Sequence, residues 1–565
     1  MKDRNGFTLV ELLAVIAILA ILVIIALPNV INMYNKAQKE TFLTEAKKVY
    51  SESEKKYLSN VISGEKTKVI NSEDSSKLDM TGSKLQYCVI LNNSGKVTDM
   101  KVSNGKWIAS LKDGKTVEDL TIDDLEDGNL EGYNCKQNAP KVPEATNCTF
   151  DGDLVQGAKY VNGQYTYRYM QEYGPRSSSK SISNVNESLN VKLMNSTVVS
   201  LATTGYTWNN MSSDGWGVIL TDRTSTEPVT SKVCTYINGK PITSMSAMFY
   251  NSKASSIDLS SFNTSNVTNM SNMFKNSMSE SLNLKNFDTS KVTNMRYMFS
   301  GNKAKDLDLT NFDTSNVTDM GAMFYKSEAT SLDLSSFDTS KVTDMGGMFG
   351  ESAATNINIS SFDTSNVIDM IVMFSESQAT SLDLSNFNTS KVTDMSSMFR
   401  ESAATNINVS SFDTTNVTNM ERMFYKSKVQ SLNLSNFVTP EVTNMYSMFE
   451  LSDIVSLNIN NFDTSKVTNM KYMFRYMEKV QVLDLSSFDT KNVTDMSYMF
   501  SESDALKTIY ASEKFVTTNV TDSRYIFNYV PSLVGGNGTK YKDYGDDITY
   551  ARIDTPSTPG YFTKK

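Results

Sequence analysis

A pattern of apolar and polar residues repeats with a period of 25 across residues 242–528. Its most regular feature is a phenylalanine that follows Met-x-x-Met, as in Met320–Phe324. Ten of these phenylalanines are evenly spaced, and an eleventh follows after a single-residue insertion. A fixed short period indicates stacked units that share a continuous core, so we predict a solenoid. The phenylalanines are Phe249, Phe274, Phe299, Phe324, Phe349, Phe374, Phe399, Phe424, Phe449, Phe474 and Phe500.

Each unit combines a short strand pattern with a short helical pattern. Leu332–Leu334 reads Leu-Asp-Leu, which predicts a strand with two side chains inward and one outward. Phe337 adds a second buried layer. Val342–Phe349 places Val, Met, Met and Phe at the spacing of one or two helical turns. We interpret the methionines as core filler rather than copper ligands, because an unbranched thioether adapts to irregular gaps.

The outward strand position is always Asp or Asn, and it forms the candidate binding face of the array. Stacked amides can form hydrogen bonds along such a column. Where two aspartates are neighbours, as at Asp308 and Asp333, like charges repel unless a cation or a ligand compensates them. A solvated column that tolerates the repulsion is the simpler interpretation, and both stay open. The positions are Asp258, Asn283, Asp308, Asp333, Asn358, Asp383, Asn408, Asn433, Asn458 and Asp484.

The chain begins with a short polar leader and a long apolar run. Residues 7–27 are apolar apart from Thr8 and Glu11, and this length crosses a hydrocarbon core of ~30 Å as a helix. Lys2 and Arg4 precede the run, so the N-terminus is expected in the cytoplasm and the remainder outside. A cleaved secretory signal fits less well, because the run is too long and no small-residue cleavage site follows it.

Glu11 lies inside this run, where a carboxylate costs about 2.5–3.5 kcal/mol on insertion scales. It is therefore a functional candidate, unless it is a chance acidic residue near the interface. Gly6–Leu12 reads Gly-Phe-Thr-Leu-Val-Glu-Leu and resembles the processing motif of type IV prepilins and pseudopilins. The resemblance extends through Pro28 to about residue 60. It implies cleavage after Gly6 by a prepilin peptidase, N-methylation of Phe7, and packing with other pilin subunits in which Glu11 neutralises a neighbour's terminal amine.

The apolar positions continue at helical spacing after Pro28, so we expect one helix from Phe7 to about Leu58 with a kink at the proline. Three strand-like runs follow: Gln86–Leu91, Lys96–Val102 and Lys106–Leu111. They predict an antiparallel meander packed on the helix, as the pilin resemblance implies. The apolar helix positions are Val30, Tyr34, Phe42, Ala46, Val49, Tyr50 and Tyr57.

Four cysteines lie far apart with no C-x-x-C motif. An even number in an exported chain suggests two disulfides, and four cysteines allow three connectivities. A proline-bearing linker at residues 138–147 separates two modules. We therefore expect Cys88 to pair with Cys135 on one side of it, and Cys148 with Cys234 on the other.

Segments on both sides of the repeats are expected to close the array, because a solenoid exposes an apolar end. Residues 148–241 contain aromatic, β-prone segments such as Tyr160–Tyr167, Thr204–Trp208 and Gly215–Leu220. A sugar-binding platform is the alternative for these aromatics. The predicted divisions are a leader at 1–6, a membrane and pilin-like helix at 7–60, a β head at 61–137, the linker at 138–147, a β-rich cap at 148–241, the solenoid at 242–528 and a closing cap at 529–565.

The repeat F-D-T-S-x-V-T-D-M-x-x-M-F resembles the leucine-rich repeats of BspA-like bacterial surface proteins, over about residues 148–565. The resemblance implies surface display and adhesion to host proteins or other cells. The cysteine common after the Met-Phe pair in such repeats is absent here, as at Ser327 and Ser377. The predicted fold class is α+β: a long membrane helix with a small β head, then a capped leucine-rich-repeat solenoid of strands and short helices.

The composition argues against nucleic-acid binding and against chemistry that needs histidine. The net charge is −9 without long charge runs, which argues against a nucleic-acid partner. The chain has no histidine, which removes imidazole bases and most zinc sites. The acidic stretch Glu118–Asp127 lacks the ligand spacing of a calcium loop and is interpreted as a solvated loop. We expect no cofactor, no metal and no enzymatic activity.

We therefore predict a single-pass membrane protein with its N-terminus in the cytoplasm and its body at the cell surface, or on a pilus after processing. It is expected to be a minor or tip subunit of a type IV filament that displays the repeats to an extracellular protein or cell-surface ligand. The alternatives are a membrane-anchored binding protein that does not polymerise, and a pseudopilin of a secretion or DNA-uptake system.

Overall fold

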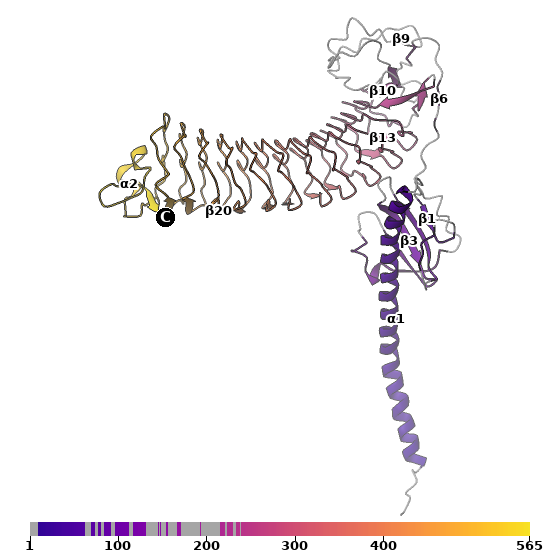
Figure 1. The fold of residues 1–565 in the computed structure, drawn as a ribbon. Helices are drawn as coiled ribbons and strands as arrows, with labels where there is room; N and C mark the ends of the chain where they lie inside the picture. The colour runs from indigo at the N-terminus through magenta and orange to yellow at the C-terminus, as the bar shows by residue number, and fades with distance from the viewer. Residues whose placement is uncertain are drawn as a thin grey trace, which may run out of the picture. The chain divides into compact units, whose positions relative to one another are not determined.

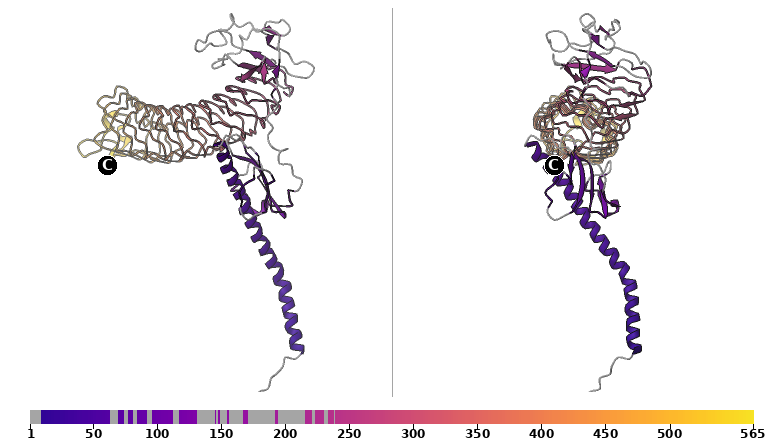
Figure 2. Two further views of the ribbon diagram at one scale, coloured as in Figure 1. Left: turned by 45° about the vertical axis from the view of Figure 1, so that its right-hand side comes forward. Right: turned by 90° about the vertical axis from the view of Figure 1, so that its right-hand side faces the viewer.

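The computed structural model divides into two compact units, residues 1–140 and residues 141–565. It describes residues 9–62, 69–73, 77–80, 84–91, 96–111, 117–130, 215–220, 223–229, 233–237 and 239–565, with short pieces at 145, 147–148, 154–155, 167–170 and 192–193. Figures 1 and 2 show the two units, a helix with a small sheet and an array of stacked coils, which we describe separately. The boundary between them lies within the stretch 138–147.

The first unit is organised around one 54-residue helix, α1 (Leu9–Ile62). Phe42, Ala46, Val49 and Tyr57 are buried on its inner face, as their spacing predicts. Two other members of the predicted apolar face are exposed, because burial on the helix begins only at Phe42. These are Val30 (58% exposed) and Tyr34 (62%).

The predicted membrane span occupies the first part of α1. Among the described residues, no helix is sufficiently long and apolar to cross a membrane. The side chains of residues 7–27, apart from Leu13, lie outside the described residues. The span and the kink at Pro28 therefore stay predictions.

A five-stranded antiparallel sheet packs on the second half of α1, in the order β1-β2-β3-β4-β5. Its strands match the three predicted runs to within a residue and add one strand at each edge. At the β3–β4 turn, the Asn104 side chain accepts hydrogen bonds from the Lys106 and Trp107 amides, both at 3.0 Å. Trp107 then packs against Phe42 with ring centroids 6.4 Å apart and the rings tilted. The strands are β1 (Val69–Asn71), β2 (Gln86–Leu91), β3 (Val97–Ser103), β4 (Trp107–Leu111) and β5 (Glu126–Asp127), with a 3-10 turn at Ile122–Asp124.

The second unit is a β-solenoid in which equivalent residues of successive coils lie side by side. The predicted short strands form in most coils, and neighbouring strands pair in parallel register, as in Leu332 with Ile357. Leu332 and Leu334 point inward and Asp333 outward, as predicted. The strands are β13 (Ser256–Asp258), β14 (Ser281–Asn283), β15 (Ser331–Asp333), β16 (Asn356–Asn358), β17 (Ser381–Asp383), β18 (Asn406–Asn408), β19 (Ser431–Asn433) and β20 (Ser456–Asn458).

The Met-x-x-Met-Phe segment forms successive turns, so the predicted short helix is wrong. The Met323 amide donates to the Met320 carbonyl, three residues back, at 3.1 Å. The next amide, that of Phe324, donates instead to Met348 in the following coil at 2.9 Å. Ala322 has φ of +53°, which an α-helix does not allow. Alternate amides thus bond between coils, whereas a helix would direct each amide four residues back within its own coil.

The core of the solenoid consists of two stacks of phenylalanine rings between layers of leucine and methionine. Rings of the Phe249–Phe500 series are buried and stack at 5.3–5.9 Å. A second series, which includes Phe337, stacks at 6.2–6.4 Å. The paired methionines are fully buried beside the first series, as core filler should be.

The described part of the segment before the repeats closes one end of this core. Trp216, Val218, Ile219 and Leu220 are buried in the same apolar cluster as the first coils, which favours core packing over a sugar platform for Gly215–Leu220. The other two aromatic segments lie outside the described residues, except for the backbone of Tyr167. The strands here are β6 (Asn147–Cys148), β7 (Leu154–Val155), β8 (Tyr167–Met170), β9 (Lys192–Leu193), β10 (Trp216–Leu220), β11 (Tyr236–Ile237) and β12 (Lys240–Ser244).

The C-terminal segment covers the other end. Tyr561 and Phe562 are fully buried against Phe527 at the last coil. Asp554 is 8% exposed and accepts hydrogen bonds from the Asn537 and Thr539 amides at 2.8 and 3.0 Å. The elements are β21 (Val482–Leu485), β22 (Thr508–Ala511), α2 (Tyr541–Tyr544), a 3-10 turn at Ile548–Tyr550 and β23 (Phe562–Lys564), with β21, β22 and β23 paired in parallel.

Candidate functional site

The ten Asp and Asn residues of the candidate binding face lie in one column along the strand side of the solenoid. In each coil the side-chain oxygen accepts a hydrogen bond from the backbone amide two residues later, at 3.0–3.3 Å. This Asx turn ends the short strand and needs a carbonyl or carboxylate oxygen one methylene from the backbone. The restriction to Asp and Asn therefore has a structural cause in every coil.

Amides also link neighbouring coils in this column, in four separate pairs that leave out the coil of Asp308. Asn358 donates to Asp333 at 2.9 Å, and Asn408 donates to Asp383 at 2.9 Å. The same contact joins Asn283 to Asp258 and Asn458 to Asn433, at 3.0 Å in both cases. Each linked step is also a strand pair, β13 with β14, β15 with β16, β17 with β18 and β19 with β20. From residue 331 to residue 458 the structural repeat is thus a pair of coils.

The adjacent aspartates Asp308 and Asp333 are each satisfied by their own donors. Asp308 accepts from the Thr310 amide and hydroxyl at 3.1 and 2.6 Å. Asp333 accepts from the Ser335 amide at 3.1 Å as well as from Asn358. At the end of the column, Asp484 forms an ion pair with Lys565. Among the described residues, no cluster of three or more carboxylate or cysteine side chains could hold a metal ion.

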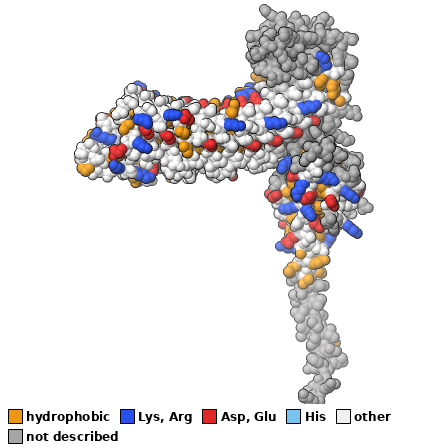
Figure 3. All heavy atoms as spheres, viewed as in Figure 1, with side chains coloured by type: hydrophobic (Ala, Val, Ile, Leu, Met, Phe, Trp, Pro, Cys, Tyr) orange, Lys and Arg blue, Asp and Glu red, His pale blue; other side chains and the backbone are white. Residues whose placement is uncertain are grey.

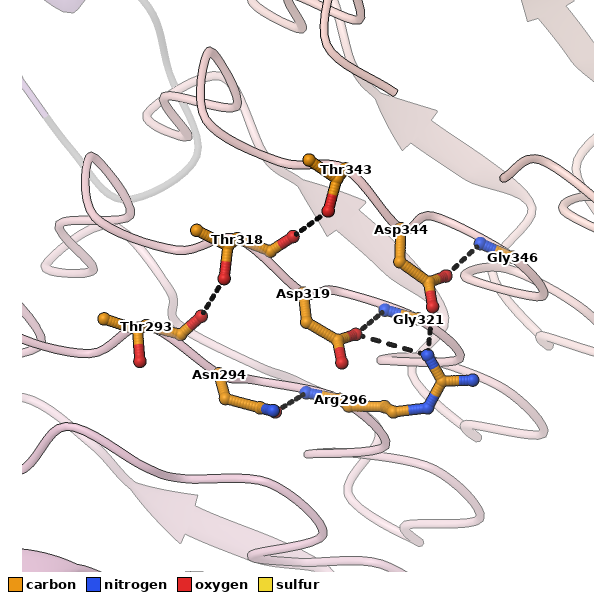
Figure 4. Close-up of polar contacts among 9 residues, drawn as sticks. All are labelled: Thr293, Asn294, Arg296, Thr318, Asp319, Gly321, Thr343, Asp344 and Gly346. Atoms are coloured by element: carbon orange, nitrogen blue, oxygen red, sulfur yellow. Dashed lines mark hydrogen bonds and ion pairs between the residues drawn. The ribbon is translucent and has the colours of Figure 1, made fainter. Parts of the chain in front are cut away.

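A second column of Asp and Asn, which the sequence analysis did not single out, precedes the first methionine of each turn. These side chains also accept from the amide two residues later, at 2.8–3.2 Å. In most coils the residue before it is a threonine that donates its hydroxyl to the equivalent carbonyl of the preceding coil, as Thr318 does to Thr293 at 3.1 Å (Figure 4). Four consecutive members are aspartates: Asp319, Asp344, Asp369 and Asp394.

One arginine compensates the first two aspartates of this run. The Arg296 guanidinium extends across two coils and contacts Asp319 at 3.4 Å and Asp344 by an ion pair (Figure 4). A side chain at Gly321 would collide with this guanidinium, so the glycine leaves its path open. Burial opposes the charged guanidinium, but the two aspartates outweigh it and raise the pKa of Arg296.

The last two aspartates of the run have different environments. Asp394 accepts a hydrogen bond from the Asn419 amide group at 3.0 Å. Asp369 accepts from the Ile371 amide at 3.0 Å and lies between two carboxylates, Asp344 and Asp394. Burial, together with these two charges, raises the pKa of Asp369. The charge of Asp369 is thus the least compensated of the four.

Two protein families match this chain, one over the repeats and one at the N-terminus. The family described as "Mycoplasma protein of unknown function, DUF285" matches residues 243–362, 327–437 and 427–535, which together exceed half of the chain. The chain belongs to the DUF285 family. A second family, the "Prokaryotic N-terminal methylation motif", matches residues 1–27. No curated protein and no solved structure matches this DUF285 chain.

The predicted processing and assembly residues of the DUF285 protein lie at the edge of what the structure describes. Gly6 and Phe7 are outside the described residues. Glu11 and Pro28 belong to α1 by their backbone, and their side chains are not described. These four assignments stay predictions.

Two of the four cysteines have described side chains. Cys88, buried in β2, and Cys234 are both disulfide-bonded. The side chains of Cys135 and Cys148 lie outside the described residues, so the pairing stays a prediction. Strand β6 pairs with β11 so that Cys148 lies opposite Ile237, which brings its backbone near Cys234.

Replacing Asp369 by Asn in the DUF285 array is expected to stabilise it by about 0.5–1 kcal/mol at neutral pH, because like charges on neighbouring strands repel. Asn keeps the oxygen that accepts from Ile371 and adds a donor toward Asp344, as Asn419 does for Asp394. The raised pKa of Asp369 means that its ionised form opposes folding. The gain should therefore shrink as the pH falls and wild-type Asp369 becomes protonated. Urea unfolding at several pH values measures it.

The reverse change provides the matched control. Asn419→Asp should destabilise the array at neutral pH, because it removes the donor to Asp394 and adds a charge beside it. An Asp369→Asn variant that is less stable than wild type, or whose gain does not depend on pH, would contradict the charge argument.

Proposed function

We propose that this protein is a surface-displayed, pilin-like minor or tip subunit of a type IV filament, which presents its DUF285 array as an adhesin for an extracellular protein or cell-surface ligand. The match of residues 1–27 to the N-terminal methylation motif carries the pilin-like part of this proposal. The bulk of the array, which exceeds half of the chain, favours a minor or tip position over the repeating subunit.

The first unit supports assembly through α1. Its buried side chains begin at Phe42, and the helix exposes apolar side chains about two to three turns before it. Val30, Ile31, Met33 and Tyr34 are between 47% and 72% exposed. A continuous apolar surface of this kind on a helix is suited to packing against helices of other subunits.

The second unit supports a role in binding rather than catalysis. Its backbone is specified by buried phenylalanines, methionines and Asx turns, so the outward turn positions can vary without a change of fold. These positions carry residues as different as Ile371, Ser396, Glu421 and Lys471. A regular scaffold with variable outward side chains is typical of repeat proteins that bind other proteins. We propose no catalytic residue.

Mass spectrometry of the N-terminal peptide, from protein recovered at its native cell surface, tests the filament proposal. The mature chain is expected to begin at N-methylated Phe7. In a Gly6→Val variant, whose branched side chain occupies the position before the cleaved bond, the chain should retain Met1. A wild-type surface protein with an intact Met1 would contradict processing and would favour the alternative of an anchored protein that does not polymerise.

A Glu11→Ala variant separates processing from assembly. It should still be cleaved and methylated, but it should be lost from sheared filaments and remain in the membrane fraction, because the neighbouring terminal amine then has no carboxylate partner. Equal recovery of wild type and Glu11→Ala in filaments would contradict the assembly role of Glu11. Wild-type protein that is processed but absent from filaments would favour a pseudopilin.

A further inference from the structure

Four tyrosines on the turns of the last coils form a continuous row of ring contacts, one edge-to-face and two tilted. Ring centroids are 5.6 Å apart for Tyr446 and Tyr472, 5.0 Å for Tyr472 and Tyr498, and 5.0 Å for Tyr498 and Tyr525. The backbone of the last three has φ of +58° to +61°, the turn geometry described above. We call Tyr446, Tyr472, Tyr498 and Tyr525 the tyrosine stack.

The stack runs toward the end of the array where tyrosines are most exposed, although Tyr446, Tyr472 and Tyr498 are themselves half-buried. Within the described part of the second unit, the tyrosines that are about half exposed or more are Tyr525 (50%), Tyr529 (62%) and Tyr544 (49%). Figure 3 shows charged and apolar side chains along the array, most densely toward its C-terminal end. Exposed aromatics concentrated at one end mark an interaction surface.

Cations are interleaved with the tyrosine rings. The Lys471 ammonium lies 5.0 Å from the ring of Tyr472. The Arg475 guanidinium lies 5.1 Å from Tyr472 and 5.4 Å from Tyr498. Tyrosine and arginine are the residues that most often dominate binding energy at protein interfaces, because they offer large rigid contact areas with polar tips.

The carboxylates around the stack are already occupied by donors of the same chain. Glu450 is 6% exposed and accepts from Arg475 at 3.2 Å. Asp522 accepts from the Arg524 guanidinium at 2.7 and 2.9 Å, and this contact holds the pKa of Asp522 at about 2. Both carboxylates, Glu450 and Asp522, therefore already accept hydrogen bonds from the same chain.

Donors at the same surface remain available. Among the described residues, no hydrogen bond involves the phenol groups of Tyr472, Tyr498 or Tyr525, and Lys471 forms no ion pair. A partner that supplies acceptors, which means carboxylates and carbonyls, fits these donors. Neighbouring rings meet edge-to-face at 79° or are tilted by 35° to 38°. A neutral sugar would not use the charge of Lys471, so charge complementarity favours an acidic segment.

We propose that the tyrosine stack is a docking surface for an acidic protein segment, whose carboxylates accept from the phenols and pair with Lys471. The proposal rests on the binding function proposed for the array, and it names the face and the partner chemistry.

Binding of fluorescein-labelled oligoglutamate to the full-length protein in detergent, followed by fluorescence anisotropy, tests the proposal. Wild type should bind oligoglutamate but not oligolysine. Tyr498→Ala should weaken binding about tenfold or more, in the range of an interface hot spot. Tyr498→Phe keeps the ring in the stack and should weaken binding about threefold through loss of the hydroxyl. Lys471→Gln should weaken it and reduce its dependence on salt.

The matched control is Tyr297→Ala. Tyr297 occupies the same turn position with φ of +57° and packs beside Lys275, but it lies outside the stack. This variant should bind like wild type. Unchanged binding of both Tyr498 variants, or binding to hyaluronate without binding to oligoglutamate, would overturn the proposal.

Adhesion of cells that carry these variants separates the two proposals. If wild-type cells adhere and Tyr498→Ala cells adhere equally, the docking surface is wrong while the adhesin function stands. If wild-type cells do not adhere to any protein-coated surface, the adhesin function itself is wrong. Loss of adhesion in Tyr498→Ala but not in Tyr297→Ala supports both.

Discussion

Replacing Phe374 by alanine is expected to lower the free energy of unfolding by about 3–5 kcal/mol, the usual cost of truncating a fully buried phenylalanine. Phe374 is 0% exposed and stacks on Phe349 at 5.4 Å and on Phe399 at 5.9 Å. The cavity would therefore open in the middle of a continuous column, with a neighbouring ring on each side. Chemical denaturation followed by circular dichroism measures the loss.

The control for this prediction lies six residues earlier. Ile368 is 57% exposed and stands where most other coils have the threonine that donates to the preceding coil. Ile368→Thr should change stability by no more than about 0.5 kcal/mol, because exposed substitutions away from packing contacts have small effects. A Phe374→Ala variant as stable as Ile368→Thr would show that the ring column does not hold the coils together.

Removing the Asp554 carboxylate is expected to destabilise the C-terminal end of the array by about 3 kcal/mol or more, because several buried donors lose their acceptor at once. In addition to two backbone amides, Asp554 accepts from the Thr539 hydroxyl at 2.7 Å and from the Gly560 amide at 3.2 Å. Asp554→Ala should therefore loosen the closing segment and expose the last coil. Hydrogen exchange of residues 529–565, compared with the central coils, measures the effect.

The pH dependence of Asp554 has a definite sign. Burial opposes its charge, but the hydrogen bonds from Thr539, Asn537 and Gly560 outweigh burial and hold its pKa below the usual value. Its stabilisation is therefore complete above the unfolded pKa of about 3.9 and is lost as the pH falls through the lower folded value. Asp543→Ala, at an exposed position of α2, should leave exchange unchanged. Equal exchange in both variants would contradict the role of Asp554.

The stacking of the repeats could be predicted from the sequence because the phenylalanine period allows only one register. The short helix could not be told from a series of turns, since apolar residues at i and i+3 fit both. Two features distinguish the turns from a helix. Alternate amides donate to the next coil, and residues such as Ala322 have a left-handed backbone conformation. A non-glycine residue gives no sequence signal of that conformation.

The sequence predicted that the Asp and Asn residues of the candidate binding face form a column, but not what restricts this position to Asp and Asn. Adjacent aspartates left a solvated column and a ligand-compensated column both open, and the structure provides an Asx turn that accounts for the restriction to Asp and Asn. The compensation by Arg296 could not be predicted, because it joins residues 23 and 48 positions away in the sequence. The tyrosine stack left a readable signal, tyrosine at one turn position in three consecutive coils, at Tyr472, Tyr498 and Tyr525.

The pairing of coils also constrains how such an array can change length by recombination between its nearly identical repeats. Between residues 331 and 458, gain or loss of 50 residues keeps each donor, such as Asn358, beside an acceptor coil, such as that of Asp333. Gain or loss of 25 residues leaves one coil without this hydrogen bond, as the coil of Asp308 already is. Natural variants of the array are therefore expected to differ more often by even numbers of coils than by odd numbers.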